Sequence, residues 1–240
     1  MELGVTESLA VAATAAVQKG DLELLKRLLN ENPGLAAARI GDERMSRTLL
    51  HAATDWPGHY PNNAATVALL VEAGADVDAR FAGPHTETAL HWAASSDDVA
   101  MLDALLDHGA DIEAPGGVIG NGTPLADAVA FGQWRAAIRL VDRGAEANLW
   151  QAAALGLMDR VKEEFEGEAA PPPGDVTNAF WHACNGDQQE TAEYLLERGA
   201  DLNWVGHDDL TALDAAVGSG AGDLVEWLRL LGGKSASDLT

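Results

Sequence analysis

The chain has 240 residues and a net charge of −23, from 38 acidic and 15 basic side chains, and 47% of its residues are hydrophobic. This composition is typical of a folded globular protein, and no apolar run is long enough to cross a bilayer. The negative charge argues against nucleic acid and anionic membranes as partners and favours a basic one. One cysteine, Cys184, and an N-terminal stretch that begins acidic rather than basic predict a cytoplasmic protein without a secretion signal.

A six-residue phrase returns along the chain, each time at the end of an apolar helical run. It reads GADVDA at 74–79, GADIEA at 109–114, GAEANL at 144–149 and GADLNW at 199–204. The first three copies begin 35 residues apart, at 74, 109 and 144. A period of this length indicates a protein built from stacked repeats.

A second phrase opens each repeat. It reads TLLHAA at 48–53, TALHWAA at 88–94, TPLADAVAFG at 123–132, TNAFWHACNG at 177–186 and TALDAAVGSG at 211–220. The threonine can cap a helix, because its hydroxyl accepts an early backbone N–H. A short Ala-rich helix, a turn and a Leu-rich helix follow, and the glycine of the closing phrase permits the left-handed residue that ends a helix. Each repeat is therefore predicted to be a helix–turn–helix unit.

These phrases resemble the ankyrin repeat, which begins T-P-L-H-x-A-A and ends G-A-D. The segment 88–114 follows that pattern almost position by position, and the resemblance extends over roughly residues 8–233. It implies an all-α ankyrin-repeat solenoid in a single domain, 1–234, with a disordered tail, 235–240. It also implies about seven units, which begin near Val11, Thr48, Thr88, Thr123, Ala147, Thr177 and Thr211.

Two segments depart from the repeat pattern. Residues 55–63, DWPGHYPNN, are inserted between the helices of one unit, and their prolines and glycine predict an ordered turn. The fifth unit, near 147–175, lacks the closing phrase and contains Pro171–Pro173. Three consecutive prolines predict a stiff extended connector, at which the array bends or loosens.

The resemblance also implies a concave groove formed by the first helices of the units and the turns between units. One position per unit, the x of T-x-L-H-x-A, is expected to face this groove, and it is occupied by Ala52, Trp92, Asp127, Gln151, Trp181 and Ala215. Tryptophan combines a large apolar area with a hydrogen-bond donor and is common in binding hot spots. The alternative is that Trp92 and Trp181 cover neighbouring turns. The predicted contact residues are Trp56, Phe81, Trp92, Ser95, Asp127, Gln151, Trp181 and Trp204.

The function expected from this groove is that of a module that binds a protein or peptide partner. The alternative is a small-molecule-binding protein or an enzyme that uses the groove as a pocket, with Asp55, His59, Asp127 and His182 as acid–base residues. His51 and His91 stand at the H of the opening phrase, where the resemblance implies a bond to neighbouring backbone. No metal site is expected at His51, Asp55 and His59, because Pro57 and Gly58 interrupt the helix, and no cofactor motif is recognised.

Overall fold

The computed structural model describes residues 1–167 and 169–239. They divide into two compact units, Met1–Ala145 (unit 1) and Glu146–Thr240 (unit 2). The boundary between the two units lies inside the third closing phrase, and the single domain of residues 1–234 stays a prediction. No helix in the described ranges is long and apolar enough to span a bilayer.

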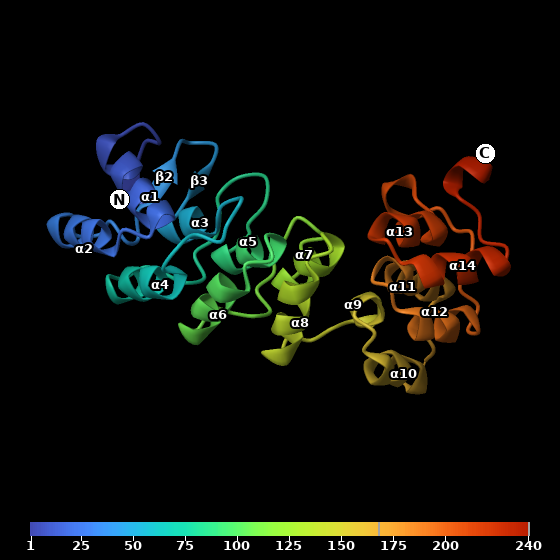
Figure 1. Ribbon diagram of the computed structural model, residues 1–240. Coiled ribbons are helices and arrows are strands. Elements are labelled where there is room, and N and C mark those ends of the chain that lie inside the picture. The colour runs from blue at the N-terminus through green and yellow to red at the C-terminus, as the bar shows by residue number, and fades with distance from the viewer. Residues whose placement is uncertain (168, 240) are drawn as a thin grey trace. The chain divides into compact units, whose positions relative to one another are not determined.

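Seven consecutive helix pairs make up most of the described chain, as the repeat pattern predicts (Figure 1). Unit 1 contains α1 (Ser8–Lys19), α2 (Leu22–Glu31), α3 (Leu49–Thr54), α4 (Asn63–Glu72), α5 (Ala89–Ser95), α6 (Val99–Asp107), α7 (Pro124–Ala130) and α8 (Trp134–Asp142). Unit 2 contains α9 (Leu149–Ala154), α10 (Met158–Glu166), α11 (Pro173–Asn185), α12 (Gln189–Leu196), α13 (Ala212–Ser219) and α14 (Gly222–Leu230), with short 3-10 helices η1 (His207–Asp209) and η2 (Ala236–Asp238).

The opening phrase starts the inner helix of a pair by local capping. The Thr48 hydroxyl accepts the backbone N–H of His51, and His51 Nδ1 in return accepts the backbone N–H of Thr48. The other ring nitrogen, His51 Nε2, lies 3.1 Å from the carbonyl of Glu87 in the next unit, and His91 Nε2 lies 3.2 Å from the carbonyl of Gly122. The prediction that these histidines bond to neighbouring backbone is confirmed, since each ties one repeat to the next.

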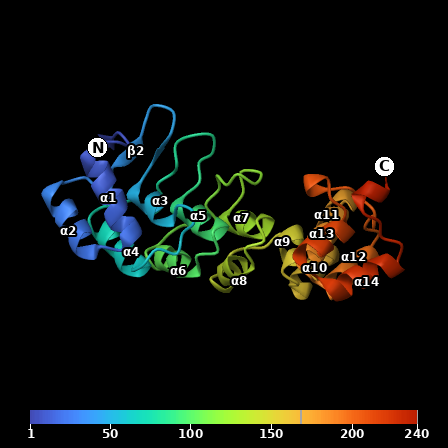
Figure 2. The ribbon, with the colours of Figure 1, turned by 45° about the horizontal axis from the view of Figure 1, so that its top comes forward.

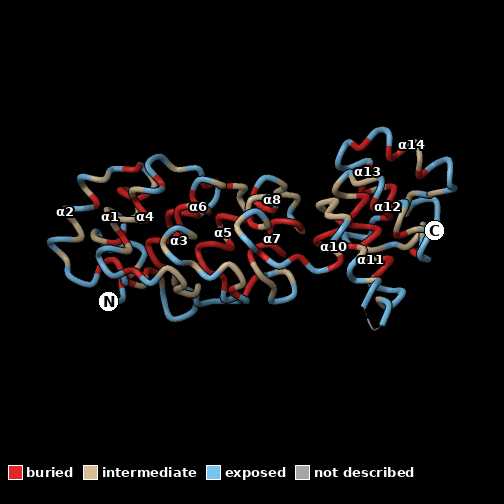
Figure 3. Tube along the Cα trace, turned by 90° about the horizontal axis from the view of Figure 1, so that it is seen from below, coloured by how far each residue is buried: buried red, intermediate tan, exposed pale blue. Residues whose placement is uncertain are grey.

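Within unit 1 the helices form two rows. The inner row consists of α1, α3, α5 and α7 and the outer row of α2, α4, α6 and α8, each helix packed against the next of its row (Figure 2). Ala52, Ala93 and Ala128 on the inner helices are fully buried, so the small side chains let neighbouring helices approach closely. The buried residues follow the interior of each unit (Figure 3).

A small sheet at the N-terminal end of unit 1 adds three short strands to the helical fold that the sequence predicts. Its strands are β1 (Glu2–Leu3), β2 (Arg39–Gly41) and β3 (Ser46–Arg47), in the order β1-β2-β3, with β1 parallel and β3 antiparallel to β2. The Asp42 carboxylate accepts the backbone N–H groups of Arg44 and Met45 and so closes the hairpin. The repeat phrases carry no signal for this hairpin, because the first of them begins at Thr48, after the hairpin has ended.

We call the segments that join an outer helix to the next inner helix the fingers; those of unit 1 are residues 32–48, 73–88 and 108–123. Each finger is bonded to the next. Ser46 and Ala82 exchange two backbone hydrogen bonds of 2.9 Å between the first and second fingers. The Arg80 guanidinium donates to the carbonyl of Pro115, and the Thr86 N–H donates to the carbonyl of Gly116, in the third finger. The fingers therefore form a connected layer beside the inner helices.

Unit 2 repeats the same design with three pairs, in which α9, α11 and α13 lie side by side. Pro173 is the first residue of α11 rather than part of an extended connector, because the fixed φ of proline suits the first turn of a helix. The end of the chain is also more ordered than predicted. Ala236 N–H donates to Asp214 at the start of α13, at 2.8 Å, and η2 follows, so residues 235–239 are folded and not a disordered tail. The last residue of the predicted tail, Thr240, lies outside the described residues.

Candidate functional site

The inserted turn after α3 presents the most exposed tryptophan of the described chain. Trp56 is 84% exposed. The turn that carries it is held on both sides: Gly58 N–H donates to the carbonyl of Asp55 at 2.7 Å, and His59 N–H donates to the carboxylate of Asp98 at 2.6 Å. His59 Nε2 also lies 2.9 Å from the carbonyl of Ser96 at the end of α5. The structure thus displays a large apolar side chain on a fixed support, as the predicted ordered turn requires.

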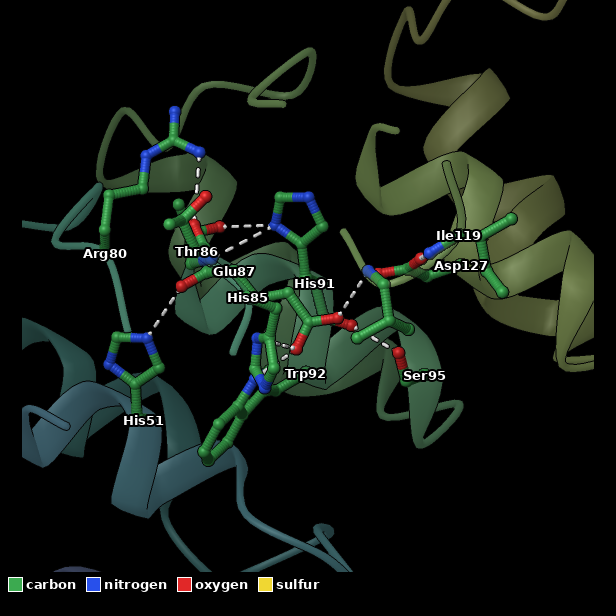
Figure 4. A network of polar contacts seen from close by, with 12 residues as sticks. His51, Arg80, His85, Thr86, Glu87, His91, Trp92, Ser95, Ile119 and Asp127 are labelled. Carbon is green, nitrogen blue, oxygen red and sulfur yellow. Dashed lines mark hydrogen bonds and ion pairs between the residues drawn. The ribbon is translucent and has the colours of Figure 1, made fainter. Parts of the chain in front are cut away.

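A cluster of aromatic rings lies between the second finger and the inner helices of unit 1. Phe81 stacks on His85 with ring centroids 4.5 Å apart, and Trp92 lies 5.6 Å from Phe81 and 5.0 Å from His51. Trp92 is half-buried, and its indole Nε1 donates to the Glu87 carboxylate at 2.7 Å (Figure 4). Phe81 and Trp92, both predicted contact residues, are thus brought together.

Beneath this cluster lies a buried pair of acids, Glu87 before α5 and Asp127 in α7. Glu87 is 5% exposed and Asp127 is 0% exposed. Glu87 Oε1 accepts the backbone N–H of Val118 at 3.2 Å, and Asp127 Oδ1 accepts that of Ile119 at 3.4 Å (Figure 4). Burial and then the neighbouring Glu87 carboxylate raise the pKa of Asp127 to about 8. Asp127 was predicted from its repeat position, whereas Glu87 was not predicted, although no other opening threonine of a full repeat follows an acid.

Unit 2 has an aromatic cluster of its own. The rings of Trp150 and Trp181 lie 4.5 Å and 5.0 Å from that of His182, whose ring is 5.0 Å from His207. Burial and the nearby His207 lower the pKa of His182 to about 3. Trp204 lies at the edge of the cluster, 6.0 Å from His207.

The prediction that Trp181 is displayed in a groove is wrong. Trp181 is only 6% exposed, and its indole Nε1 donates to the carbonyl of Leu210 at 3.0 Å. The segment before α13 therefore covers the ring, which is the alternative that the sequence left open.

The position expected to line the groove is mostly buried. Of its six occupants, only Trp92 keeps an intermediate exposure, whereas Ala52, Asp127, Gln151, Trp181 and Ala215 are buried. Gln151 instead caps its own helix through Asn148. Ser95 and Trp204, also predicted contacts, are half-buried, and the Ser95 hydroxyl donates to the carbonyl of His91 at 2.9 Å. Except at Trp92, this position therefore does not offer an exposed side chain to a partner.

The four acid–base candidates have different surroundings. Asp55 pairs with Arg47, and His59 is bonded to the end of α5. Asp127 is enclosed with Glu87, and His182 belongs to unit 2, where aromatic rings surround it. No group of three His, Cys, Asp or Glu side chains in the described ranges is placed to hold a metal ion.

Two surface pockets are described. One, of about 600 Å³, lies in unit 2 and is lined by residues that include Trp150, Glu164 and Asp175. The other, of about 580 Å³, lies beside the N-terminal sheet and is lined by residues that include Glu7, Arg39 and Glu43. Neither is lined by Trp92 or Asp127, which are the residues expected in a ligand pocket.

Capped helix pairs, stacked in rows and tied by histidines to the next finger, define a helical-repeat protein. Family models described as ankyrin repeats match residues 62–151 and 180–229, which together are more than half of the chain. The chain belongs to the ankyrin-repeat family.

Two known proteins extend this comparison. An ankyrin repeat and KH domain-containing protein of Caenorhabditis briggsae is 28% identical over 171 residues, which are 68% of this chain but only 6% of that protein. The crystal structure of the human ASB11 ankyrin repeat domain matches 92% of this chain and 97% of its own with a TM-score of 0.53 and 22% identity. The second likeness concerns the fold alone.

Proposed function

We propose that this chain is a protein-binding module whose unit 1 binds a basic segment of its partner at the ends of the inner helices. Ankyrin repeats generally serve as protein-interaction modules. The composition supports placing the module in the cytoplasm, as the sequence analysis expected. The dispersal of the acid–base candidates leaves the enzyme alternative without a reaction centre among them.

The observation that carries the proposal is the exposed indole of Trp56. An exposed tryptophan on a well-bonded turn loses little conformational entropy when a partner covers it, and such residues dominate binding energy. The turn lies beside the end of α5, because a Cβ added to Gly58 would lie 3.0 Å from the Ser96 hydroxyl. Phe131, at the end of α7, is also exposed. Two inner helices of unit 1, α3 and α7, thus present an exposed apolar side chain at or just beyond their ends.

The charge of the chain supports a basic partner. The excess of 38 acidic over 15 basic side chains gives a negative field, which attracts cationic segments and speeds their association. The proposal therefore predicts binding that weakens as salt is added, with Trp56 as the apolar anchor.

A random peptide library displayed on phage and selected on the immobilised full chain tests the proposal. Enriched peptides should carry an excess of Lys and Arg, and their dissociation constants can be measured by isothermal titration calorimetry. We expect Trp56→Ala to weaken binding at least about tenfold, as the loss of a hot-spot residue does. Leu230→Ala, which removes a side chain that is 87% exposed in unit 2, is the matched control and should leave the affinity unchanged. Equal affinity of the Trp56→Ala variant and the native chain would refute the proposal.

A further inference from the structure

The tip of the third finger, residues 115–122, rests directly on the buried acids. A Cβ added to Gly117 would lie 2.7 Å from Asp127 Oδ1 and 2.8 Å from Oδ2, so only a glycine lets the backbone approach so closely. Val118 and Ile119 then donate their backbone N–H groups to Glu87 and Asp127. Both carboxyl groups therefore hold one finger tip against α5 and α7.

The hydrogen-bond donors around the pair are unequally shared. The Glu87 carboxylate accepts bonds from the Trp92 indole and the Val118 N–H, and His85 Nδ1 lies 3.0 Å from its Oε2. The bond that Asp127 accepts from Ile119 is long, and its Oδ2 is buried with no donor placed to bond it among the described residues, whereas a hydrogen bond with Glu87 favours the protonated form of Asp127. A buried carboxylate oxygen with neither donor nor solvent is costly when ionised, and a second carboxylate beside it adds to that cost.

We infer that the carboxyl groups of Glu87 and Asp127 together hold one proton, which resides on Asp127. This proton keeps the tip of the third finger bound to the inner helices, and we call this arrangement the latch. When the proton leaves, two adjacent negative charges are enclosed under the finger, and the tip is released so that water can reach them. The latch is thus a pH-sensitive device built into unit 1, and it goes beyond the proposed binding function.

None of the charged groups described around the pair forms an ion pair with Asp127. The second finger contributes Arg80 and His85; Arg80 bonds the carbonyls of Thr86 and Pro115, and His85 faces Glu87. His91 on α5 and His51 on α3 have pKa values lowered chiefly by burial. On α8, Arg135 and Arg139 pair with Asp97 and Asp103. The finger tip itself contains no ionisable side chain.

The raised pKa of Asp127, about 8, fits this geometry and gives the direction of the response. Below that pH the shared proton is present and the finger is closed; above it the finger opens. Because Glu87 also accepts the Trp92 indole N–H, opening loosens the support of the aromatic cluster of Phe81, His85 and Trp92.

Nuclear magnetic resonance of the full chain between about pH 6 and pH 9.5 tests the inference. We expect the side-chain carboxyl carbon of Asp127 to titrate with a midpoint near 8, and the amide signals of Val118 and Ile119 to follow the same midpoint. Asp127→Asn keeps the shape of the protonated acid but cannot ionise, so both amide titrations should disappear. Between about pH 7 and pH 9, amide exchange in the native chain should rise at least about tenfold relative to this variant at the same pH.

Asp214→Asn is the matched control, because Asp214 also accepts a backbone N–H, from Ala236 in unit 2, but has no second acid described beside it. This variant should keep the titration of Val118 and Ile119. The inference is overturned if the Asp127 carboxyl shows no titration between about pH 6 and pH 9.5, or if the amide titrations persist in Asp127→Asn. The carboxyl titration of the native chain tests the inference even if the Asp127→Asn variant fails to fold. It is measured without a partner, so its result is independent of peptide binding to Trp56.

Discussion

Replacing Asp127 with asparagine should change how the stability of unit 1 depends on pH. In the folded chain, burial and Glu87 raise the pKa of Asp127 from 3.8 to about 8, whereas the unfolded chain has the ordinary value. As the pH rises from about 4 to about 8, the unfolded chain therefore releases this proton first, and the native chain loses stability relative to its unfolded state. Asparagine cannot release a proton, so the variant lacks this contribution to the loss.

The size of the effect follows from the same numbers. One proton bound only in the folded state changes the free energy of unfolding by about 1.4 kcal/mol per pH unit. Between about pH 5 and pH 8 the native chain should thus lose up to about 4 kcal/mol relative to the variant. This loss of stability cannot grow without limit, because opening of the finger tip lets water reach the ionised pair without unfolding the helices.

Urea unfolding of both proteins at about pH 5, 6.5 and 8, followed by circular dichroism, measures this difference. At the lowest pH the variant should be less stable than the native chain by about 1 kcal/mol, because the asparagine amide replaces the protonated carboxyl group of Asp127. The two stability profiles should then converge and cross as the pH rises. Profiles that stay parallel over the whole range would show that Asp127 is already ionised at the lowest pH, and the reasoning would be wrong.

Three further changes test the packing. Trp181→Ala should destabilise the chain by about 3–5 kcal/mol in urea unfolding, because its ring is buried, whereas Trp56→Ala should change stability by no more than about 0.5 kcal/mol; similar losses would contradict the assigned burial. Gly117→Ala should cost about 1–3 kcal/mol, since its Cβ would collide with the carboxyl group beneath the finger, whereas Gly174→Ala meets nothing within 4 Å and should not destabilise. Burial raises the pKa of the Cys184 thiol, so the thiol should react with a disulfide reagent in urea but not in the folded chain, and rapid native labelling would contradict this.

Much of the fold could be predicted because its signals are local. A threonine and a histidine three residues later form the caps that begin α3 and α5, and the helices extend only a few residues from them. The helix pairs and the histidine bonds between repeats therefore follow from short phrases. The hairpin of β2 and β3 does not, since it depends on how one finger pairs with its neighbours.

The candidate site could be predicted only in part, because it depends on contacts between segments far apart in the sequence. Position alone made Trp92 and Trp181 equivalent, yet the carbonyl of Leu210, 29 residues away, meets the Trp181 ring and covers it. Glu87 was overlooked for the same reason: its importance appears only when the third finger brings Val118 and the buried Asp127 beside it.

The buried acids are not the arrangement that would give unit 1 the greatest stability. An apolar pair of the same volume often packs as well as a buried ionisable pair, or better, because no charge or proton must be accommodated. Another inner helix of unit 1 shows an apolar solution, since Ala52 of α3 fills the same repeat position as Asp127 and is fully buried. What Asp127 and Glu87 provide, and alanine cannot, is a hold on the finger tip that depends on one proton. Their presence is therefore explained by control of the third finger rather than by the packing of the repeat.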